Sequence, residues 1–536
     1  MPACRIRRTA VSRGLAVGIT TALLATAAAA CGGGSGAAGT TAGTARSPLV
    51  VGTADGQVRG LTSGVVNEYL GIPYAAPPVG KLRWQPPQPP ARWRGIRPAT
   101  RFAPHCPQPA STFGRASSSE NCLFLNVFAP ATHRGRALPV MVWIHGGALV
   151  AGESDDYDPS ALVGHHVIVV TLNYRLGALG FLAHPALADK PGGPSGDYGL
   201  MDQQAALRWV QRNIRAFGGN PANVTIFGES AGGQSVLLQL VSPTARGLFT
   251  RAIAESGGYA LGQASLASAE AAGQAFAVKA GCASQTAQCL RSLPVATILA
   301  DQDQTGATID VDGRVLTKSL KAALASGQFS RVPVIDGSNH DEWRLFVALA
   351  TFEGQPVTAA NYVSMIATTL QVSSGIAAII ATQYPLSDYP SPALALSTVG
   401  TDAIFACPTL LLDQSLAKYV PTYAYEFNDE HAPDGGLPSA GFPYGAAHAA
   451  ELPYLFGLPG TTTSDFTSAQ LHLAAAMRTA WTSFATTGVP SVTAGGSWPR
   501  FTTASQAMLS LVPPQPRPET TFAADHRCAF WALGGD

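Results

Sequence analysis

Residues 224–240 read VTIFGESAGGQSVLLQL, and this stretch decides the fold class of the chain. Its first four residues are β-branched or aromatic and predict a short buried strand, whereas Gly233–Leu240 is an apolar run that predicts a helix. Ser230 lies in the turn between them, with a glycine two positions before it and another two positions after it. A turn this sharp needs small neighbours, and it places Ser230 at a helix N-terminus, where amide N–H groups favour developing negative charge. The stretch therefore predicts a strand, a turn that exposes a reactive serine, and a helix.

A second turn, upstream of the first, supports this interpretation. Val140–Ile144 is another strand-like apolar run, and it ends in the glycine-rich sequence His145-Gly146-Gly147-Ala148. A glycine-rich turn at such a place points backbone N–H groups towards a neighbouring nucleophile. We expect the N–H groups of Gly147, Ala148 and Ala231 to form an oxyanion hole, which holds the negative charge that develops on a substrate oxygen.

Several further stretches resemble the signatures of one family. They are Tyr69–Ala75, Leu82–Trp84, Ser119–Val127, Asn173–Gly177, Gly199–Gln203 and Phe217–Pro221. Together with the serine turn, they make the chain resemble the type-B carboxylesterases, which include cholinesterases, liver-type carboxylesterases and bacterial p-nitrobenzyl esterases. The resemblance runs from about Leu49 to Trp531. It implies an α/β-hydrolase fold, with a large, mostly parallel central sheet flanked by helices.

The motifs of this one site are spread over most of the chain. That spread predicts a single catalytic domain over residues 48–536 rather than several domains. Two alanine-rich stretches, Ala264–Ala325 and Val357–Ala381, favour helices. By the resemblance, we expect them to be long helical insertions over the active site.

Ser230 needs a base, because a serine hydroxyl is a poor nucleophile until an imidazole takes its proton. In this fold the order along the chain is serine, acid, histidine. His448 lies in a loop that resembles the histidine loop of the family, and it is our predicted base. His431, in the Gly/Pro-rich segment just before it, is the alternative. We assign structural roles to His472, within a helical-looking run, and to His526, just before a cysteine.

The acid that orients the imidazole is expected in the segment after the strand-like run Val332–Gly337. The Asn-x-Asp-Glu loop of the family matches this segment and places the acid at Glu342. Asp341 is the alternative acid, or else it caps the helix that follows. The family commonly has glycine after the glutamate, whereas this chain has Trp343, so we expect the loop to pack differently.

Two further residues match positions that the family uses around the site. Glu229, just before the predicted nucleophile, is expected to be a buried carboxylate that tunes charge near the catalytic residues, or else a simple hydrogen-bond anchor. Ser256 resembles the serine beside the acid of the triad. Its expected role is a hydrogen bond to that carboxylate.

Cysteine usage indicates an oxidising compartment. Of the eight cysteines, Cys4 and Cys31 fall in the N-terminal region, and the even set of six that remains favours disulfides in an exported chain. The family pairs Cys106 with Cys122, Cys282 with Cys289, and Cys407 with Cys528. The first two pairs are also close in sequence. The third rests on the resemblance alone, and a buried thiol is the alternative for its first member.

The N-terminus has the order of an export signal. Four arginines precede the apolar run Leu15–Ala30, which is too short and alanine-rich to favour a permanent membrane span. We interpret residues 1–30 as the signal and residues 31–47 as a flexible Gly/Ala/Thr tether. Residues 28–31 resemble a bacterial lipobox without its usual leucine, so Cys31 is a candidate lipid anchor. We expect an exported protein, either extracellular or tethered through Cys31 to the outer face of the cell membrane.

Composition excludes several other functions. Charged residues make up 12% of the chain, against the usual quarter, and the net charge is only +1, so no basic surface indicates a nucleic-acid partner. The sequence has no zinc-type Cys/His spacing, no phosphate loop and no dinucleotide fingerprint. We therefore expect no metal and no cofactor.

The resemblance implies a serine esterase that hydrolyses small-molecule carboxylic esters through an acyl intermediate on Ser230. Leu149, Phe346 and Phe405 are expected to line the site and to favour neutral esters of short or medium acyl length. The loop between the first two paired cysteines has no tryptophan, which argues against choline esters, because cholinesterases bind quaternary ammonium on such a ring. The Gly-Gly-Ala turn resembles those of esterases that accept bulky alcohol groups.

Two alternatives share this fold. An interfacial lipase has the same triad and differs in the lid over the site. A non-catalytic adhesion ectodomain of the neuroligin kind loses the serine, whereas this chain keeps every candidate of the triad.

Overall fold

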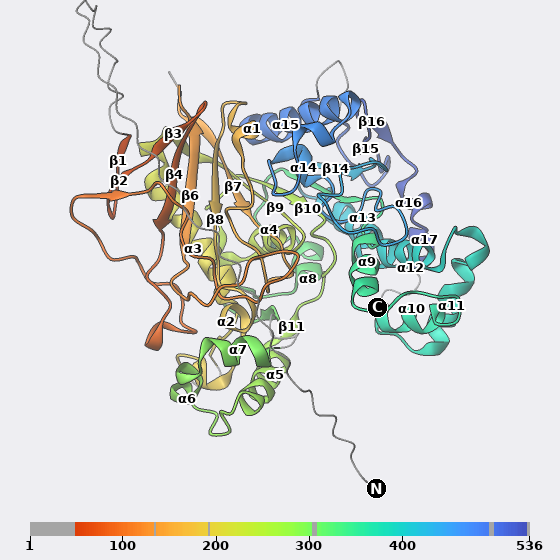
Figure 1. The fold of residues 1–536 in the computed structure, drawn as a ribbon, viewed down its shortest axis with the longest axis horizontal. Helices are drawn as coiled ribbons and strands as arrows, with labels where there is room; N and C mark the ends of the chain where they lie inside the picture. The colour runs from red at the N-terminus through yellow and green to blue at the C-terminus, as the bar shows by residue number, and fades with distance from the viewer. Residues whose placement is uncertain (1–48, 133–135, 191–192, 303–307, 493–497, 533–536) are drawn as a thin grey trace, which may run out of the picture. The chain divides into compact units, whose positions relative to one another are not determined.

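The computed structural model describes residues 49–132, 136–190, 193–302, 308–492 and 498–532. The predicted export signal and tether, with Cys31, lie outside the described residues. Within them, an 11-stranded sheet carries helices on both faces (Figure 1). The expected α/β-hydrolase class, with a large central sheet flanked by helices, is confirmed.

The strands follow one another in a fixed order across the sheet. From one edge to the other they are β16 (Arg517–Glu519), β15 (Met508–Leu511), β14 (Thr422–Phe427), β13 (Val334–Asn339), β10 (Arg251–Glu255), β9 (Gly219–Glu229), β7 (Leu138–Ile144), β8 (Ile168–Leu172), β6 (Phe124–Pro130), β4 (Val66–Pro73) and β3 (Leu61–Ser63). All neighbours from β15 to β8 pair in parallel. The pairs nearer the two edges are antiparallel. The sheet is therefore mostly parallel, as the resemblance implies.

The centre of the sheet is apolar on both faces, which is why it can be parallel. All seven residues of β7 are buried, and successive side chains point to opposite faces. Val142 packs in a cluster with Trp209 of α3 (Tyr198–Asn213) and Leu237 of α4 (Ala231–Val241). Trp143 packs on the other face with Trp481 of α15 (Ser468–Thr487). One strand thus anchors helices on both sides of the sheet.

The remaining elements are shorter or peripheral. The other helices are α1 (Ser160–Val163), α2 (Gly177–Phe181), α5 (Leu266–Lys279), α6 (Ala287–Ser292), α7 (Val295–Asp301), α8 (Leu320–Ala325), α9 (Arg344–Phe352), α10 (Tyr362–Leu370), α11 (Ser374–Gln383), α12 (Pro392–Gly400), η7 (Thr401–Ala406, a π-helix), α13 (Cys407–Leu416), α14 (Leu452–Leu455), α16 (Phe522–Asp525) and α17 (Cys528–Trp531). Two small sheets contain β1 (Val50–Thr53), β2 (Gly56–Arg59) and β5 (Ile96–Pro98), and β11 (Ala264–Ser265) with β12 (Asp310–Val311).

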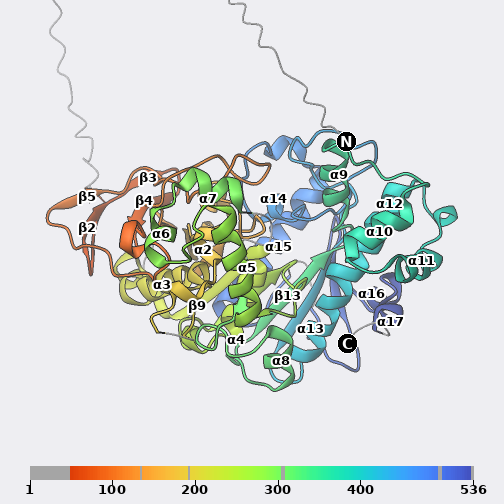
Figure 2. The same cartoon turned by 90° about the horizontal axis from the view of Figure 1, so that it is seen from below.

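Both stretches expected to be helical insertions form helices. The first contains α5 to α8 and the second contains α10 and α11. Figure 2 shows α5, α6 and α7 on one side of the molecule and α10, α11 and α12 on the other. Helices α10 and α11 pack on α12 in one apolar cluster, which also includes Val347 of α9. The continuous helical stretch Pro392–Leu416 is long and apolar enough to cross a membrane, but 67% of its most apolar window is buried, which is typical of a core helix.

Three disulfides join the cysteines in the pairs that the resemblance implies. The structure contains the bonds Cys106–Cys122, Cys282–Cys289 and Cys407–Cys528. The third attaches α17, near the C-terminus, to the start of α13. Cys407 is therefore not a free buried thiol.

Candidate active site

Ser230 occupies the turn between β9 and α4. Its backbone has φ 56° and ψ −123°, which is strained for a residue with a side chain. Two hydrogen bonds hold this conformation: Ser230 N donates to Glu255 O (2.8 Å) and Gln234 N donates to Ser230 O (2.8 Å). The surrounding strand and helix thus fix Ser230 in a backbone conformation that residues other than glycine rarely adopt. Such strained residues are frequent at functional sites.

The glycines on both sides of Ser230 are required by close backbone contacts. A Cβ atom at Gly228 would lie 2.5 Å from the carbonyl oxygen of Ile144, at the end of β7. A Cβ at Gly232 would overlap that same oxygen. The end of β7 therefore packs directly against the turn, and no side chain fits between them.

The glycine-rich turn after β7 lies beside Ser230. A Cβ at Gly146 would be 3.1 Å from the Cβ of Ser230. Gly147, Ala148 and Leu149 have φ values of 95°, 55° and 63°, so three successive residues adopt a left-handed conformation. Val150 N and Ala151 N both donate to Gly147 O, which closes the turn.

Three backbone N–H groups near Ser230 are candidate donors to a bound oxygen. Among the described residues, the N–H groups of Gly147, Ala148 and Ala231 make no hydrogen bond. Ala231 is the first residue of α4, where N–H groups lack an intrahelical acceptor. An oxygen that carries negative charge is the kind of acceptor that such free donors favour.

The ring of His145 packs against this turn. Its ring is buried, stacks on Tyr174 at a centroid distance of 4.5 Å, and has Nδ1 2.9 Å from Gly146 O. Burial lowers the pKa of His145 to about 4, so the ring is neutral at ordinary pH. His145 therefore acts as a packed, uncharged support.

His448 is hydrogen-bonded to the predicted acid. Its Nδ1 lies 2.5 Å from Glu342 Oε2, and its backbone N–H donates to Glu342 O (3.3 Å). Glu342 is fully buried, and its other oxygen, Oε1, accepts a hydrogen bond from Asn339 N (2.8 Å). This carboxylate therefore fixes the ring orientation of His448 and leaves Nε2 as the nitrogen that faces the turn.

Nε2 of His448 faces Glu229, the residue directly before Ser230. The distance from Nε2 to Glu229 Oε1 is 3.2 Å. Within the described residues, no hydrogen bond joins Ser230 Oγ to His448. The imidazole thus lies between two carboxylates, with Nδ1 on Glu342 and Nε2 at the serine turn.

This arrangement changes the pKa of both charged partners. Burial raises the pKa of Glu229 to about 8. Burial alone would lower the pKa of His448, but the charges of Glu229 and Glu342 outweigh it and raise that pKa to about 9. Glu229 therefore affects the proton affinity of the imidazole directly.

Two aromatic rings also lie close to the imidazole of His448. Phe346 of α9 and Phe405 of η7 lie with their centroids 5.1 Å and 5.0 Å from the imidazole. Trp343 packs on Phe346 at 4.5 Å and against Gly400, where a Cβ would overlap the indole. Trp343 thus stands where the family commonly has glycine, and Gly400 of α12 leaves room for its indole ring.

A further buried carboxylate, Glu451, was not predicted from the sequence. Its Oε2 accepts a hydrogen bond from Asn339 Nδ2 (2.5 Å), and the same amide donates to Ala447 O (2.7 Å). Burial raises the pKa of Glu451 to about 7. Asn339 thus ties the end of β13 to the loop that carries His448. The sequence feature that could have indicated this carboxylate is its position, three residues after His448.

The expected hydrogen bond from Ser256 to the acid is absent. Ser256 Oγ is fully buried and has no hydrogen-bond partner among the described residues. The backbone of Ser256 has φ 50°, and its N–H donates to Gly337 O. Glu342 is instead held by Asn339 N.

The alternative candidates have other partners. Asp341 forms an ion pair with Arg344 (2.8 Å) and accepts a hydrogen bond from Ala446 N (3.1 Å). The exposed residue His431 donates its backbone N–H to Asp429, and His472 is exposed on α15. His526 is buried between Asp402 and Glu426.

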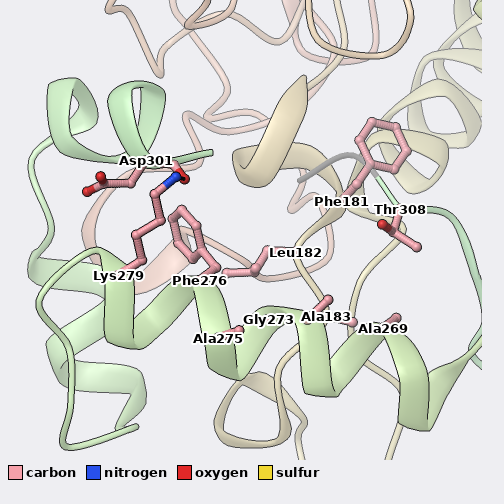
Figure 3. Close-up of a pocket in the computed structure, with 11 residues that line it drawn as sticks. Phe181, Leu182, Ala183, Ala269, Gly273, Ala275, Phe276, Lys279, Asp301 and Thr308 are labelled. Carbon is pink, nitrogen blue, oxygen red and sulfur yellow. Dashed lines mark hydrogen bonds between the residues drawn. The ribbon is translucent and has the colours of Figure 1, made fainter. Parts of the chain in front are cut away.

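A separate cavity of about 270 Å³ lies between α5 and the segment after α2 (Figure 3). Phe181, Leu182 and Phe276 of α5 line it, and Leu182 lies beside Phe276 in Figure 3. At one end, Lys279 Nζ donates a hydrogen bond to the backbone oxygen of Asp301 (2.6 Å). None of the residues that surround Ser230 lines this cavity, so it does not belong to the site.

The parallel sheet and the serine held between β9 and α4 define an α/β hydrolase. The chain belongs to the carboxylesterase family, whose model matches residues 47–531. It is a carboxylic ester hydrolase, and the predicted family resemblance is confirmed.

Individual relatives cover nearly the whole chain. Fumonisin B1 esterase of Sphingopyxis macrogoltabida is 38% identical over 523 residues, which span 93% of this chain and 92% of that protein. Para-nitrobenzyl esterase of Bacillus subtilis is 36% identical, over 86% of this chain and 94% of that protein. A solved structure of PNB esterase superposes with a TM-score of 0.76 at 34% identity, and covers 90% of this chain and 99% of that chain.

Proposed function

We propose that this protein is a serine esterase in which Ser230 is the nucleophile, His448 the base and Glu342 the acid that orients the base. The observation that carries the proposal is the hydrogen bond between His448 Nδ1 and Glu342 Oε2, with Nε2 directed at the turn that holds Ser230. That bond fixes one tautomer and stabilises the imidazolium that forms during reaction.

The reaction begins when the Ser230 side chain turns towards Nε2 of His448. Its oxygen attacks the ester carbonyl carbon while its proton passes to Nε2. The free N–H groups of Gly147, Ala148 and Ala231 bind the oxyanion of the tetrahedral intermediate. His448 then gives its proton to the leaving alcohol, and an acyl group remains on Ser230.

Water completes the cycle. His448 takes a proton from a water molecule, which attacks the acyl carbon, and the acid product leaves as Ser230 recovers its proton. Because His448 must begin each half-reaction neutral, hydrolysis should fall as the pH drops through the pKa of this group. Glu229 acts as the buried carboxylate that sets that pKa.

The rings of Phe346 and Phe405 beside His448 favour neutral esters with short or medium acyl groups. The family acts on small-molecule esters. Fumonisin B1 belongs in the assay panel, since a relative that is 38% identical is named for it. Esters of tertiary alcohols belong there too, because of the Gly-Gly-Ala turn.

We also propose that residues 48–536 are the catalytic domain of an exported protein, with residues 1–30 as the signal and residues 31–47 as the tether. The three disulfides support export, because such bonds persist in oxidising compartments. Lipid attachment at Cys31 would hold the enzyme at the outer face of the membrane, and release by cleavage nearby would make it extracellular.

The test is a p-nitrophenyl ester chain-length series on the wild type and on Ser230→Ala. We expect the variant to lose about 10⁴-fold or more in kcat, because the nucleophile is removed. Ser364→Ala, an exposed serine on α10, is the matched control and should keep full activity. Full turnover by Ser230→Ala would contradict the proposal. Higher activity on emulsified long-chain esters than on soluble short ones would indicate the interfacial lipase.

A further inference from the structure

Three side chains with metal-binding atoms meet at the carboxyl ends of β13 and β14. His340 follows β13, Glu426 lies on β14, and His526 lies between α16 and α17. The pairing of β13 with β14 brings the first two together, because His340 N donates to Phe427 O (3.0 Å). One ligand atom from each of the three side chains lies within 4.8 Å of the other two.

Each histidine has a carboxylate at its Nδ1 nitrogen. His526 Nδ1 is hydrogen-bonded to Asp402 Oδ1 (2.7 Å), and His340 Nδ1 lies 3.2 Å from Asp341 Oδ1. With a carboxylate at each Nδ1, Nε2 is the nitrogen that we assign to a ligand, and Nε2 of His526 is hydrogen-bonded to Glu426 in this structure. Histidines that bind metals almost always have their other nitrogen bonded in this way, which fixes the ring orientation and raises its basicity.

The carboxylates around the cluster are themselves held in place. Asp402 Oδ2 accepts a hydrogen bond from Tyr384 (2.8 Å), and Trp531 Nε1 donates to that tyrosine hydroxyl (2.7 Å). Glu426 Oε2 accepts from Asn428 Nδ2 (2.8 Å), which leaves Oε1 directed at His526 Nε2, at 2.6 Å. The cluster is thus ordered by several elements and does not consist of free surface side chains.

Solvent can reach this cluster. A cavity of about 40 Å³ lies beside the two histidines, and Asp341, Asp402 and Arg344 also line it, whereas Glu426 does not. Arg344 is paired with Asp341 (2.8 Å). The side chain of His340 is 41% exposed. One water needs about 10–15 Å³ of such volume, so the cavity has room for a water ligand beside the two histidines.

We propose that His340 Nε2, His526 Nε2 and Glu426 Oε1 form a binding site for a divalent cation of the zinc type, with water as the fourth ligand. Two imidazoles and one carboxylate are a known zinc ligand set. Binding breaks the hydrogen bond between His526 and Glu426, moves the two ligand atoms apart around the ion, and releases any proton on Nε2 to solvent. The ion would join β13, β14 and the C-terminal segment, which goes beyond the esterase function.

The competing arrangement is a proton in place of the metal. His526 would then be an imidazolium held between Asp402 and Glu426, and no cation would bind. Both arrangements hold the C-terminal segment, so stability alone does not separate them. Direct measurement of metal binding does.

The experiment titrates zinc chloride into the full-length, untagged protein after EDTA treatment and dialysis. Calorimetry and elemental analysis of the dialysed complex give affinity and stoichiometry. We expect one zinc ion at this site in the wild type and loss of that ion in His340→Ala. This variant changes a half-exposed side chain, so it is expected to fold, whereas a variant of the buried His526 is a poorer test.

Two further variants sharpen the result. Asp402→Asn should weaken zinc binding by about 10- to 100-fold, because it alters the group that orients His526. His472→Ala, which removes an exposed histidine on α15, should bind as the wild type does. Zinc should raise the melting temperature of the wild type and of His472→Ala, but not that of His340→Ala. Cobalt should give the visible absorption of a four-coordinate site only where His340 is present.

A wild type that binds no zinc at this site, or a His340→Ala variant that binds it equally well, would overturn the proposal. Ser230→Ala should bind zinc normally. The result therefore stands apart from the test of catalysis.

Discussion

His448 is an imidazole with a buried carboxylate at each nitrogen. In the proposed mechanism, Glu342 at Nδ1 holds the tautomer that a general base requires, and Glu229 at Nε2 lies where the proton of Ser230 would arrive. Both carboxylates favour the protonated ring, which is the inactive form of the base. If His448 is the base, as we propose, we expect the onset of activity to lie above the ordinary pKa of histidine, because Glu229 and Glu342 raise the pKa of the ring.

Glu229→Gln should shift that onset. Removal of the charge at Nε2 lowers the pKa of His448, and an opposite charge at this distance typically shifts a pKa by about 1–3 units. The acidic limb of kcat/KM against pH should therefore move to lower pH by about 1–3 units. The profile is measured with p-nitrophenyl acetate at the isosbestic wavelength of p-nitrophenol.

Glu353→Gln, an exposed carboxylate just after α9, is the matched control and should leave the profile unchanged. An acidic limb that stays in place or moves to higher pH in Glu229→Gln would show that this carboxylate does not set the pKa of His448.

At the scale of elements, the site depends on how closely β7, β9 and α4 approach one another. The end of β7 touches the serine turn through the carbonyl oxygen of Ile144, and the next residues form the turn with free N–H groups. One contact thus positions both the proposed nucleophile and the proposed oxyanion donors. A displacement of α4 would misplace both together.

Gly232→Ala should disrupt this contact. The new Cβ would overlap the backbone oxygen of Ile144, which belongs to a central strand and cannot move aside as a flexible side chain does. We expect a fall in kcat/KM of about 10²-fold or more, since small misplacements of catalytic groups have effects of this size. Soluble yield should also fall. The assays are steady-state kinetics and thermal unfolding.

Gly375→Ala is the matched control, because a Cβ there meets nothing within 4 Å and Gly375 lies in α11. This change should leave kinetics unaltered and raise stability by about 0.5–1 kcal/mol, as alanine is the better helix former. Equal kinetics for both variants would contradict the role given to the β7 contact.

At the scale of the molecule, the parts of the fold predicted from sequence were those with a strong local pattern. The runs that became β7 and β9 are continuous and apolar, and the serine turn has glycines that the close packing requires. The family resemblance added the order of the site residues. It also implied the three disulfide pairs that the structure contains.

The remaining features depend on contacts between distant residues. Asn339 and Glu451 are 112 residues apart and meet only because the loop of His448 folds back onto the end of β13. Ser256 was expected to hold Glu342, but the structure has Asn339 N, at the end of β13, in that position. Trp343 fits because Gly400, in another helix, leaves room for the indole. Such pairings are set by tertiary packing, which periodicity and motif spacing do not encode.

The disulfides should contribute unequally to stability, because they close loops of different length. Cys407–Cys528 spans 121 residues, whereas Cys282–Cys289 spans 7. If a disulfide stabilises mainly by restricting the unfolded chain, the long loop is worth about 5 kcal/mol and the short one about 2 kcal/mol. Cys407→Ala/Cys528→Ala should therefore lower the free energy of unfolding more than Cys282→Ala/Cys289→Ala does. The second double variant is the control, because it also removes one disulfide, but one that closes a much shorter loop.

Chemical denaturation of both double variants, alongside the wild type, measures the difference. The long-loop variant should also lose stability preferentially in its C-terminal segment, because α17 is attached to α13 by that bond. Hydrogen exchange of residues 517–531 should then be faster than in the wild type, while exchange in β7 and β9 stays slow. An equal loss of stability in the two variants would mean that loop length does not determine what each disulfide contributes, and that local packing around Cys282 is as important as the attachment of the C-terminus.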